Sequence, residues 1–189
     1  NHTCATVEGG GVWCWGLNSS LQVAQQTGQA YSKPMLVGSV GGGSTVAKQI
    51  SAGANHTCAV MTDGGVTCWG DNGKSQLSAP GAPVGPNGVS LGAPAAMVAA
   101  GSTHSCAVVS GAIKCWGAYD NGQLGIGPTV AGATSSPVAA LGIAGTASAV
   151  VAGGGHTCAL VAGAVTCWGS SSGGQLGAGV TLGGNSPIP

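Results

Sequence analysis

The sequence has very few charged residues. Only 4% of its 189 residues are charged, all four cations are lysines, and the formal net charge is +0; an ordinary soluble domain is roughly 25% charged. A surface that binds nucleic acid needs clustered cations to neutralise phosphates, so nucleic-acid partners are excluded. Charge-driven disorder is excluded as well, because 43% of the residues are hydrophobic.

Phenylalanine and long apolar runs are also absent. Glycine, serine and threonine interrupt every apolar stretch before it reaches the roughly 18 residues of a membrane helix, so no membrane insertion is expected. The 38 glycines follow no Gly-X-Y period, which excludes collagen. So little surface charge favours association, and we therefore expect the surface to be covered by sugar, by copies of the chain, or by both.

One motif recurs four times along the chain. The segment NHTCAVMTDGGVTCWG at residues 55–70 returns with small changes at 1–16, 103–117 and 155–169. Each copy has a His two residues before the first Cys, a Trp-Gly pair after the second Cys, and a Gln seven residues after that Trp. These residues are His2, His56, His104 and His156; Trp15, Trp69, Trp116 and Trp168; Gln22, Gln76, Gln123 and Gln175. A period near 50 residues with short strands indicates propeller blades.

The combined motif resembles the regulator of chromosome condensation repeat over essentially the whole chain. That family forms β-propellers with blades of four antiparallel strands. The resemblance implies an all-β domain, 1–189, of four propeller-type repeats at about 1–45, 46–96, 97–146 and 147–189. Cysteine in both hairpin strands is similar to secreted bacterial members. The charged loops and basic extensions on which exchange on a small GTPase and chromatin binding depend have no counterpart in this chain.

The first motif lacks the strand ending in Ala-Gly that precedes the other three. We therefore expect the four repeats to belong to a longer array, or to an array whose edge is completed by another copy. Open blade edges favour such stacking, which gives a ring if it closes and a filament if it does not.

Hairpin register predicts how the eight cysteines pair. In the third repeat, a two-residue turn at Ser110-Gly111 places Cys106 opposite Cys115 at a non-hydrogen-bonded position, where Cα atoms lie about 4.5 Å apart. A three-residue turn such as Thr62-Asp63-Gly64 absorbs the extra residue of the first two repeats. The predicted disulfides are Cys4–Cys14, Cys58–Cys68, Cys106–Cys115 and Cys158–Cys167. Disulfides predict an extracellular or cell-surface location.

The repeated His-x-Cys units are an alternative zinc-binding pattern, but their spacing is unlike that of structural zinc sites, so neither a metal nor a cofactor is expected. The repeated histidine is expected to hydrogen-bond the backbone of a neighbouring blade. We expect each Trp of the Trp-Gly pairs to cover the apolar face of the next blade, and the Gln-Leu-Gly segments to lock one blade to the next.

Catalysis needs several different groups at one place, whereas the polar groups of this chain recur identically in each repeat. The carboxylates Glu8, Asp63, Asp71 and Asp120 occupy different repeat positions, and neither a Gly-x-Ser-x-Gly elbow nor a Walker loop occurs. The sequence therefore predicts that the protein is not an enzyme. Acceptor sequons for N-linked sugar begin at Asn1, Asn18 and Asn55.

Two functional hypotheses follow. The first is an extracellular structural protein: a disulfide-stapled, glycosylated array that self-associates into a fibre or surface layer, with copies of itself and covalent glycans as partners. The alternative is a secreted β-propeller binding module that recognises protein or carbohydrate through inter-strand loops at residues 24–45, 78–96 and 126–148. Those loops have few aromatic residues, a poor composition for interface hot spots.

Overall fold

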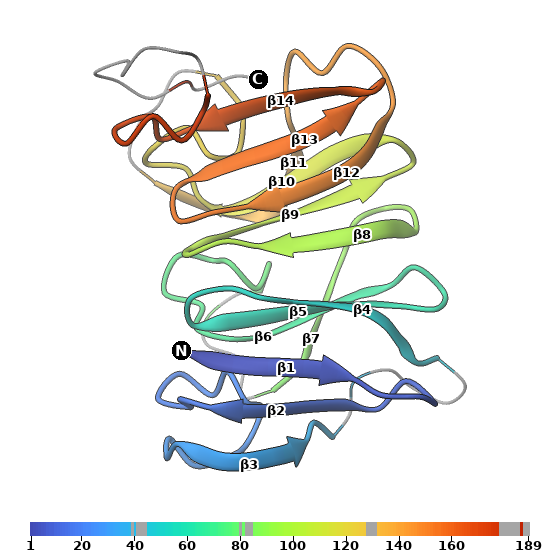
Figure 1. The fold of residues 1–189 in the computed structure, drawn as a ribbon, viewed down its shortest axis with the longest axis vertical. Coiled ribbons are helices and arrows are strands. Elements are labelled where there is room, and N and C mark those ends of the chain that lie inside the picture. Colours follow the sequence, from blue (N-terminus) through green and yellow to red (C-terminus); the bar gives the residue numbers. More distant parts are fainter. Residues whose placement is uncertain are drawn as a thin grey trace.

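Each of the four repeats folds into one antiparallel sheet, called a blade below (Figure 1). Blade 1 contains β1 (His2–Thr6), β2 (Val12–Gly16) and β3 (Tyr31–Leu36). Blade 2 contains β4 (Ala47–Ala52), β5 (His56–Met61), β6 (Val66–Gly70) and β7 (Asn87–Val89). Blade 3 contains β8 (Ala95–Ala100), β9 (His104–Val109), β10 (Ala112–Ala118) and β11 (Ala133–Ala139). Blade 4 contains β12 (Ala147–Ala152), β13 (His156–Val161) and β14 (Ala164–Gly169).

These bounds come from a computed structural model that describes residues 1–38, 40, 45–79, 81, 85–127, 132–177 and 186. Every regular element within these residues is a strand, and the strands of each sheet follow one another in chain order. The predicted all-β array of four propeller-type blades is confirmed. The repeat boundaries inferred from the sequence remain a proposal.

The central hairpins close through the turns that the sequence predicts. Ser110 and Gly111 both have positive φ, 51° and 79°, and Val109 pairs with Ala112 across them. Positive φ at both turn residues is the type I′ geometry, which matches the twist of paired strands. Ala162 and Gly163 repeat this geometry in blade 4. In blade 2 the longer turn enters the left-handed region at Gly64, where φ is 83°.

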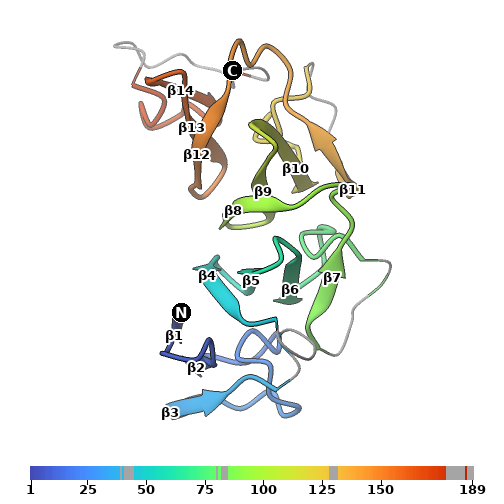
Figure 2. The same ribbon diagram turned by 90° about the vertical axis from the view of Figure 1, so that its right-hand side faces the viewer.

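The first strands of blades 2, 3 and 4 form an inner edge from which the other strands lead outward (Figure 2). Side chains fix the register between these inner strands. Gln49 donates to the Val98 carbonyl at 2.9 Å and accepts from the Val98 N–H at 2.8 Å. Ser51 accepts from the Ala100 N–H at 3.0 Å. Blade 1 packs on this edge through β1, which lies against β4.

The hydrophobic core lies between the blades. Val60 and Val66 of blade 2 share one cluster with Val98 and Trp116 of blade 3. The Trp side chain therefore packs on the preceding blade, and the prediction that it covers the next blade is wrong. Adjacent residues of a strand point to opposite faces, and the neighbouring Cys115 already faces the next blade, in the cluster shared with blade 4.

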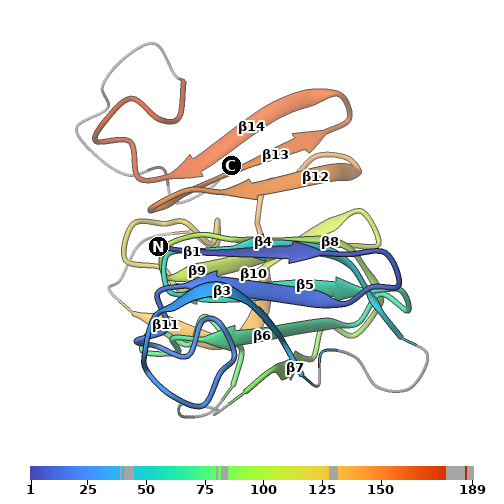
Figure 3. The same ribbon diagram turned by 60° about the horizontal axis from the view of Figure 1, so that its bottom comes forward.

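Two blade faces are left open by the described residues. Figure 3 turns blade 1 toward the viewer, and no other strand lies in front of β1, β2 and β3. Trp15 is partly exposed there, whereas Trp69, Trp116 and Trp168 are completely buried. At the other end of the array, blade 4 exposes the face opposite to the one that packs on blade 3.

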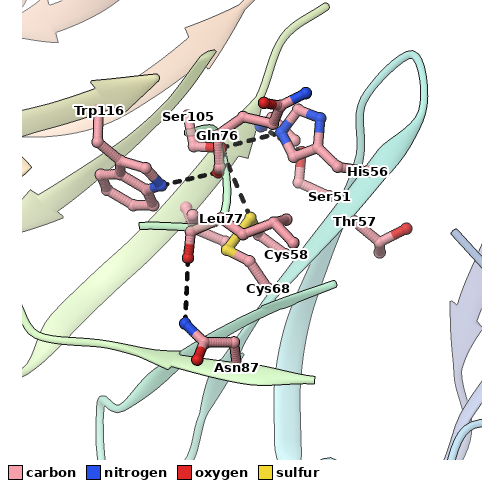
Figure 4. Close-up of a disulfide and its surroundings, with 12 residues drawn as sticks. Ser51, His56, Thr57, Cys58, Cys68, Gln76, Leu77, Asn87, Ser105 and Trp116 are labelled. Carbon is pink, nitrogen blue, oxygen red and sulfur yellow. Dashed lines mark hydrogen bonds between the residues drawn. A yellow bond between two sulfur atoms is a disulfide. The ribbon is translucent and has the colours of Figure 1, made fainter. Parts of the chain in front are cut away.

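The four predicted cysteine pairs are joined in the structure, each at directly opposed hairpin positions with Cα atoms 4.0–4.1 Å apart. Cys58 pairs with Cys68 in the register of β5 and β6. Their sulfur atoms point toward blade 3, where the Cys58 Sγ lies 3.7 Å from the Ser105 hydroxyl (Figure 4). The disulfides thus belong to the same buried layer as the contacts between blades.

Candidate functional site

The most elaborate polar arrangement in the molecule lies at the junctions between blades. At the junction of blades 2 and 3, the Nε2 atom of His56 bonds the Ser105 hydroxyl at 2.9 Å (Figure 4). The Ser105 hydroxyl donates to the Gln76 carbonyl at 3.0 Å, and the Trp116 Nε1–H donates to the same carbonyl at 2.8 Å. We call these four groups the interblade network.

The network occurs three times. Its members at the other junctions are His2, Thr57, Gln22 and Trp69, and His104, Thr157, Gln123 and Trp168. In every case the His and Gln come from one blade and the hydroxyl and indole from the following blade. The predicted role of the Gln segments as locks between blades agrees with these contacts.

The histidine partner differs from the prediction. We expected a backbone group, whereas the partner is the side chain that directly follows the His of the next repeat, as Ser105 follows His104. Because neighbouring strand residues point to opposite faces, this hydroxyl points back toward the preceding blade. The sequence feature that indicates this contact is the recurring His-Thr or His-Ser pair. The His of each pair contacts the following blade, and the hydroxyl residue contacts the preceding blade.

Hydrogen-bond direction sets the histidine tautomer. The single Ser105 hydroxyl hydrogen goes to the Gln76 carbonyl, so the His56 Nε2 must carry the hydrogen that it shares with Ser105. The Nδ1 atoms of His2, His56 and His104 are buried without a partner among the described residues. Burial lowers the pKa of His56 to about 4 and that of His104 to about 3, with a smaller contribution from neighbouring histidines. These imidazoles are neutral at pH 7.

The Gln side chains hold the loops that follow the Trp-Gly pairs. Gln76 accepts from the Lys74 N–H at 2.7 Å and donates to the Asp71 carboxylate at 2.9 Å. The residue in the position of Asp71 in blade 1 is Leu17, and the buried Nε2 of Gln22 has no partner among the described residues. A buried unpaired donor costs about 1–3 kcal/mol of stability.

We expect the substitution Leu17→Asp to raise the free energy of unfolding by about 1–2 kcal/mol, because a carboxylate at this position accepts from Gln22 as Asp71 does from Gln76. Leu17 is 40% exposed, so little apolar burial is lost. Urea denaturation measures the change. Leu17→Ala is the control that removes the leucine without adding an acceptor; equal stabilities of the two variants would contradict the assignment.

The three glycosylation candidates have different surroundings. Asn1 is exposed and Asn55 is half-buried, and sugar on either remains a prediction. Asn18 is completely buried; its side chain accepts from the Val23 N–H at 2.9 Å and donates to the Gln25 carbonyl at 3.0 Å. A glycan on this amide nitrogen would break the loop, so Asn18 is wrong as a candidate. A sequon describes local sequence, whereas burial depends on how the loop folds.

The three predicted recognition loops are also partly wrong, because each contains a strand: β3, β7 and β11 respectively. Residues 39, 41–44, 80, 82–84 and 128–131 of these ranges lie outside the described residues. The true long connections follow each Trp-Gly pair and gather at one end of the blades, on the left in Figure 1. Their described parts, residues 17–30, 71–79, 119–127 and 170–177, are called the loop face below.

Three of the eight charged side chains lie on the loop face: Asp71, Lys74 and Asp120. The Lys74 Nζ is 3.5 Å from the Asp120 Oδ2, which links the loops of blades 2 and 3. Asn72 orders the loop of blade 2 by accepting from the Leu77 N–H at 2.9 Å and donating to the Ala79 carbonyl at 3.0 Å.

A cavity of about 240 Å³ lies where the inner strands turn, lined by residues 52–54, 100–102 and 152–154. Backbone bonds join these turns, such as Ala54 N–H to the Gly101 carbonyl at 3.2 Å. No acidic or basic side chain lines it. In the part of the chain that the structure describes, no group of three or more His, Cys, Asp or Glu is placed to hold a metal, and no helix is long and apolar enough to cross a membrane.

Comparison with known proteins agrees with this architecture. A sequence model of the regulator of chromosome condensation (RCC1) repeat matches residues 9–60 and 110–160, and a second model of the same repeat matches residues 47–76. Protein pim1 of Schizosaccharomyces pombe is 30% identical to this chain, over 67% of this chain and 27% of pim1.

Solved structures match the whole chain. Yeast RCC1 (Prp20), in a complex with Kap60, has a TM-score of 0.84 and 22% identity, and the match covers 100% of this chain and 46% of that one. Human WBSCR16 also has a TM-score of 0.84, with 23% identity, and the match covers 100% of this chain and 50% of that one. The chain thus spans about half the length of these relatives, and the likeness shows the fold.

Two expectations are corrected by these relatives. The prediction that the partners are copies of the chain is wrong: the yeast relative is bound to Kap60 in one structure, and another describes its binding to Gsp1p and histones. In this chain, the three internal junctions are formed by blades of the same chain.

The extracellular location is wrong as well, since histones are intracellular proteins. Opposed hairpin positions bring two sulfur atoms together through strand register alone, so the pairing geometry carries no information about the compartment.

The matched segments cover more than half of the chain. They include Trp15, His56, Trp116 and His156, which are positions of the recurring motif on four different blades. Matching sequence, four-bladed architecture and overall structural likeness lead to one conclusion. The chain belongs to the regulator of chromosome condensation (RCC1) repeat family.

Proposed function

We propose that the chain is a protein-binding module that recognises its partner through the loop face. The observation that carries the proposal is the ion pair of the exposed Lys74 and the half-buried Asp120, which come from neighbouring blades and lie side by side. An exposed ion pair contributes little to stability. Charged groups at the rim of an interface instead select the partner and raise the association rate.

The loop around Lys74 is ordered before any partner binds. Asp71 accepts from the Gly73 N–H at 3.0 Å and from the Gln76 side chain, and Asn72 bonds both ends of the loop. A rigid loop loses little conformational entropy on binding, which favours affinity. The yeast relative Prp20 supplies the class of partner, because its two solved structures describe binding to other proteins.

The partner is proposed to be a protein with a weakly charged surface. The chain has four carboxylates in all, and they are divided between the loop face and the hairpin turns, so they form no acidic patch for a strongly basic protein. No catalytic step is proposed, because the polar groups that recur at each junction are engaged with one another inside the structure.

Lys74→Glu is expected to weaken partner binding at least about fivefold, because like-charge repulsion with Asp120 replaces the ion pair that joins the loops of blades 2 and 3. The matched control is Lys48→Glu, the same charge change on the exposed second residue of β4, at the opposite end of the blade. Affinity capture with the purified chain, quantified by mass spectrometry, compares the three proteins. Purified Gsp1p serves as a defined probe, and the strongly basic histones are expected not to bind. Equal losses for both variants, or no specific partner of the unmodified chain, would contradict the proposal.

A further inference from the structure

The Cys58–Cys68 disulfide packs against the loop of blade 2 that carries Lys74, residues 71–79, called the Lys74 loop below. Both cysteines are completely buried, and they share one apolar cluster with Leu77 and Ala79 of this loop. Figure 4 shows Leu77 beside the two sulfur atoms. The inner side of the Lys74 loop therefore rests on the disulfide.

Polar contacts also lead from this disulfide to Lys74. The Cys58 Sγ lies 3.7 Å from the Ser105 hydroxyl, which donates to the Gln76 carbonyl at 3.0 Å (Figure 4). The Gln76 side chain accepts from the Lys74 N–H at 2.7 Å, and the Lys74 Nζ is 3.5 Å from the Asp120 carboxylate of the neighbouring loop. The disulfide is thus connected to the loop face by polar contacts as well as by apolar packing.

The Ser105 hydroxyl has different contacts in the two oxidation states of the cysteine pair. Its single hydrogen goes to the Gln76 carbonyl and one lone pair accepts from His56, while no described residue donates to its second lone pair. A disulfide sulfur has no hydrogen to donate there, whereas a Cys58 thiol does. Two separate thiols also need more room than two bonded sulfur atoms, and a close-packed layer gives that room only when its neighbours move.

We propose that the Cys58–Cys68 pair is a redox-responsive anchor of the Lys74 loop, and that its reduction loosens this loop. The reductant is a dithiol: one thiolate attacks a sulfur atom of the pair, the S–S bond breaks, and the second thiol of the reductant resolves the mixed disulfide. Two electrons and two protons pass to the protein, which gives two cysteine thiols and the cyclic disulfide of the reductant. Disulfides of cytosolic proteins are usually transient in this way.

The first test compares amide hydrogen exchange of the Lys74 loop in oxidised protein and in protein reduced with dithiothreitol. No partner is present, so the result does not depend on the proposed function. Alkylation followed by mass spectrometry identifies the cysteine pairs that are reduced in each sample. We expect exchange in the loop to become at least about fivefold faster once Cys58–Cys68 is reduced, while β9 and β10 remain protected. Unchanged exchange in the loop would overturn the proposal.

Two matched double variants separate this effect from general unfolding, because each retains three disulfides. Cys58→Ala with Cys68→Ala removes the sulfur atoms that contact the Lys74 loop, and Cys106→Ala with Cys115→Ala makes the same change in blade 3. Each variant should accelerate exchange at least about fivefold in the loop of its own blade and less than about twofold in the other loop. Equal effects of the two variants on the Lys74 loop would contradict its control by the disulfide of blade 2.

The rate of reduction tests the connection through Ser105. A thiolate must reach the sulfur atoms, which are completely buried, so the junction between the blades has to open first. Ser105→Ala removes the hydroxyl from the junction of blades 2 and 3, and Thr157→Ala removes the equivalent hydroxyl from the junction of blades 3 and 4. Ser105→Ala should raise the reduction rate of the blade 2 disulfide relative to the blade 3 disulfide at least about threefold, and Thr157→Ala should lower this ratio. A ratio that neither variant changes would contradict the connection.

Discussion

Replacing Trp116 by alanine is expected to lower the free energy of unfolding by about 3–5 kcal/mol. The indole is completely buried between blades 2 and 3, in contact with the cluster that contains Val60 and Val66. Its Nε1–H also donates to the Gln76 carbonyl at 2.8 Å, so the variant loses apolar contact and leaves a buried acceptor with one partner fewer. Chemical denaturation followed by circular dichroism measures the loss.

Trp15→Ala is the matched control for this substitution. Trp15 has the same place in its repeat, but it lies on the open face of blade 1 and is partly exposed. Trp15→Ala should therefore lower the free energy of unfolding by less than half as much as Trp116→Ala does. Trp116→Phe removes the hydrogen bond but retains an aromatic ring at this position. Its loss of free energy of unfolding should lie between those of Trp116→Ala and Trp15→Ala. Equal losses for Trp116→Ala and Trp15→Ala would show that burial between blades does not control stability.

Lowering the pH from 7 to 5 is expected to destabilise the fold through His56 and His104. Both pKa values are lowered by burial, to about 4 and about 3, from an ordinary value of 6.5. Below pH 6.5 the unfolded chain therefore binds protons that the folded chain does not, and stability falls as the pH falls. Each histidine contributes a slope of up to about 1.4 kcal/mol per pH unit in this window.

The double variant His56→Gln, His104→Gln tests the origin of this slope. A glutamine amide can donate to the Ser105 or Thr157 hydroxyl as the imidazole does, but it does not titrate between pH 7 and 5. Free energies of unfolding measured at several pH values should show a flatter dependence for the double variant. If the double variant retains the steep pH dependence of the unmodified chain, groups other than these two histidines are responsible for it.

The sequence determined the local structure of this protein. The pairing of Cys106 with Cys115 follows from a two-residue turn at Ser110-Gly111, because hairpin register depends on a few consecutive residues and on the alternation of strand side chains. The spacing of the His, Trp and Gln residues likewise predicted four β-blades, since each repeat must bury its apolar positions against neighbours of the same kind.

Tertiary structure alone decided how the repeats meet. The motif does not say which blade a side chain faces, so Trp116 was assigned to the wrong neighbour and the partner of His56 to the backbone. Asn18 lies in a sequon, but the fold of its loop buries the side-chain amide. These contacts join residues up to about a repeat apart in sequence, and they are fixed by the packing of one twisted sheet on the next. Val66 and Val165 occupy the same strand position in blades 2 and 4, but Val66 is buried and Val165 is exposed. They differ because another blade lies against Val66, whereas no described blade lies against Val165.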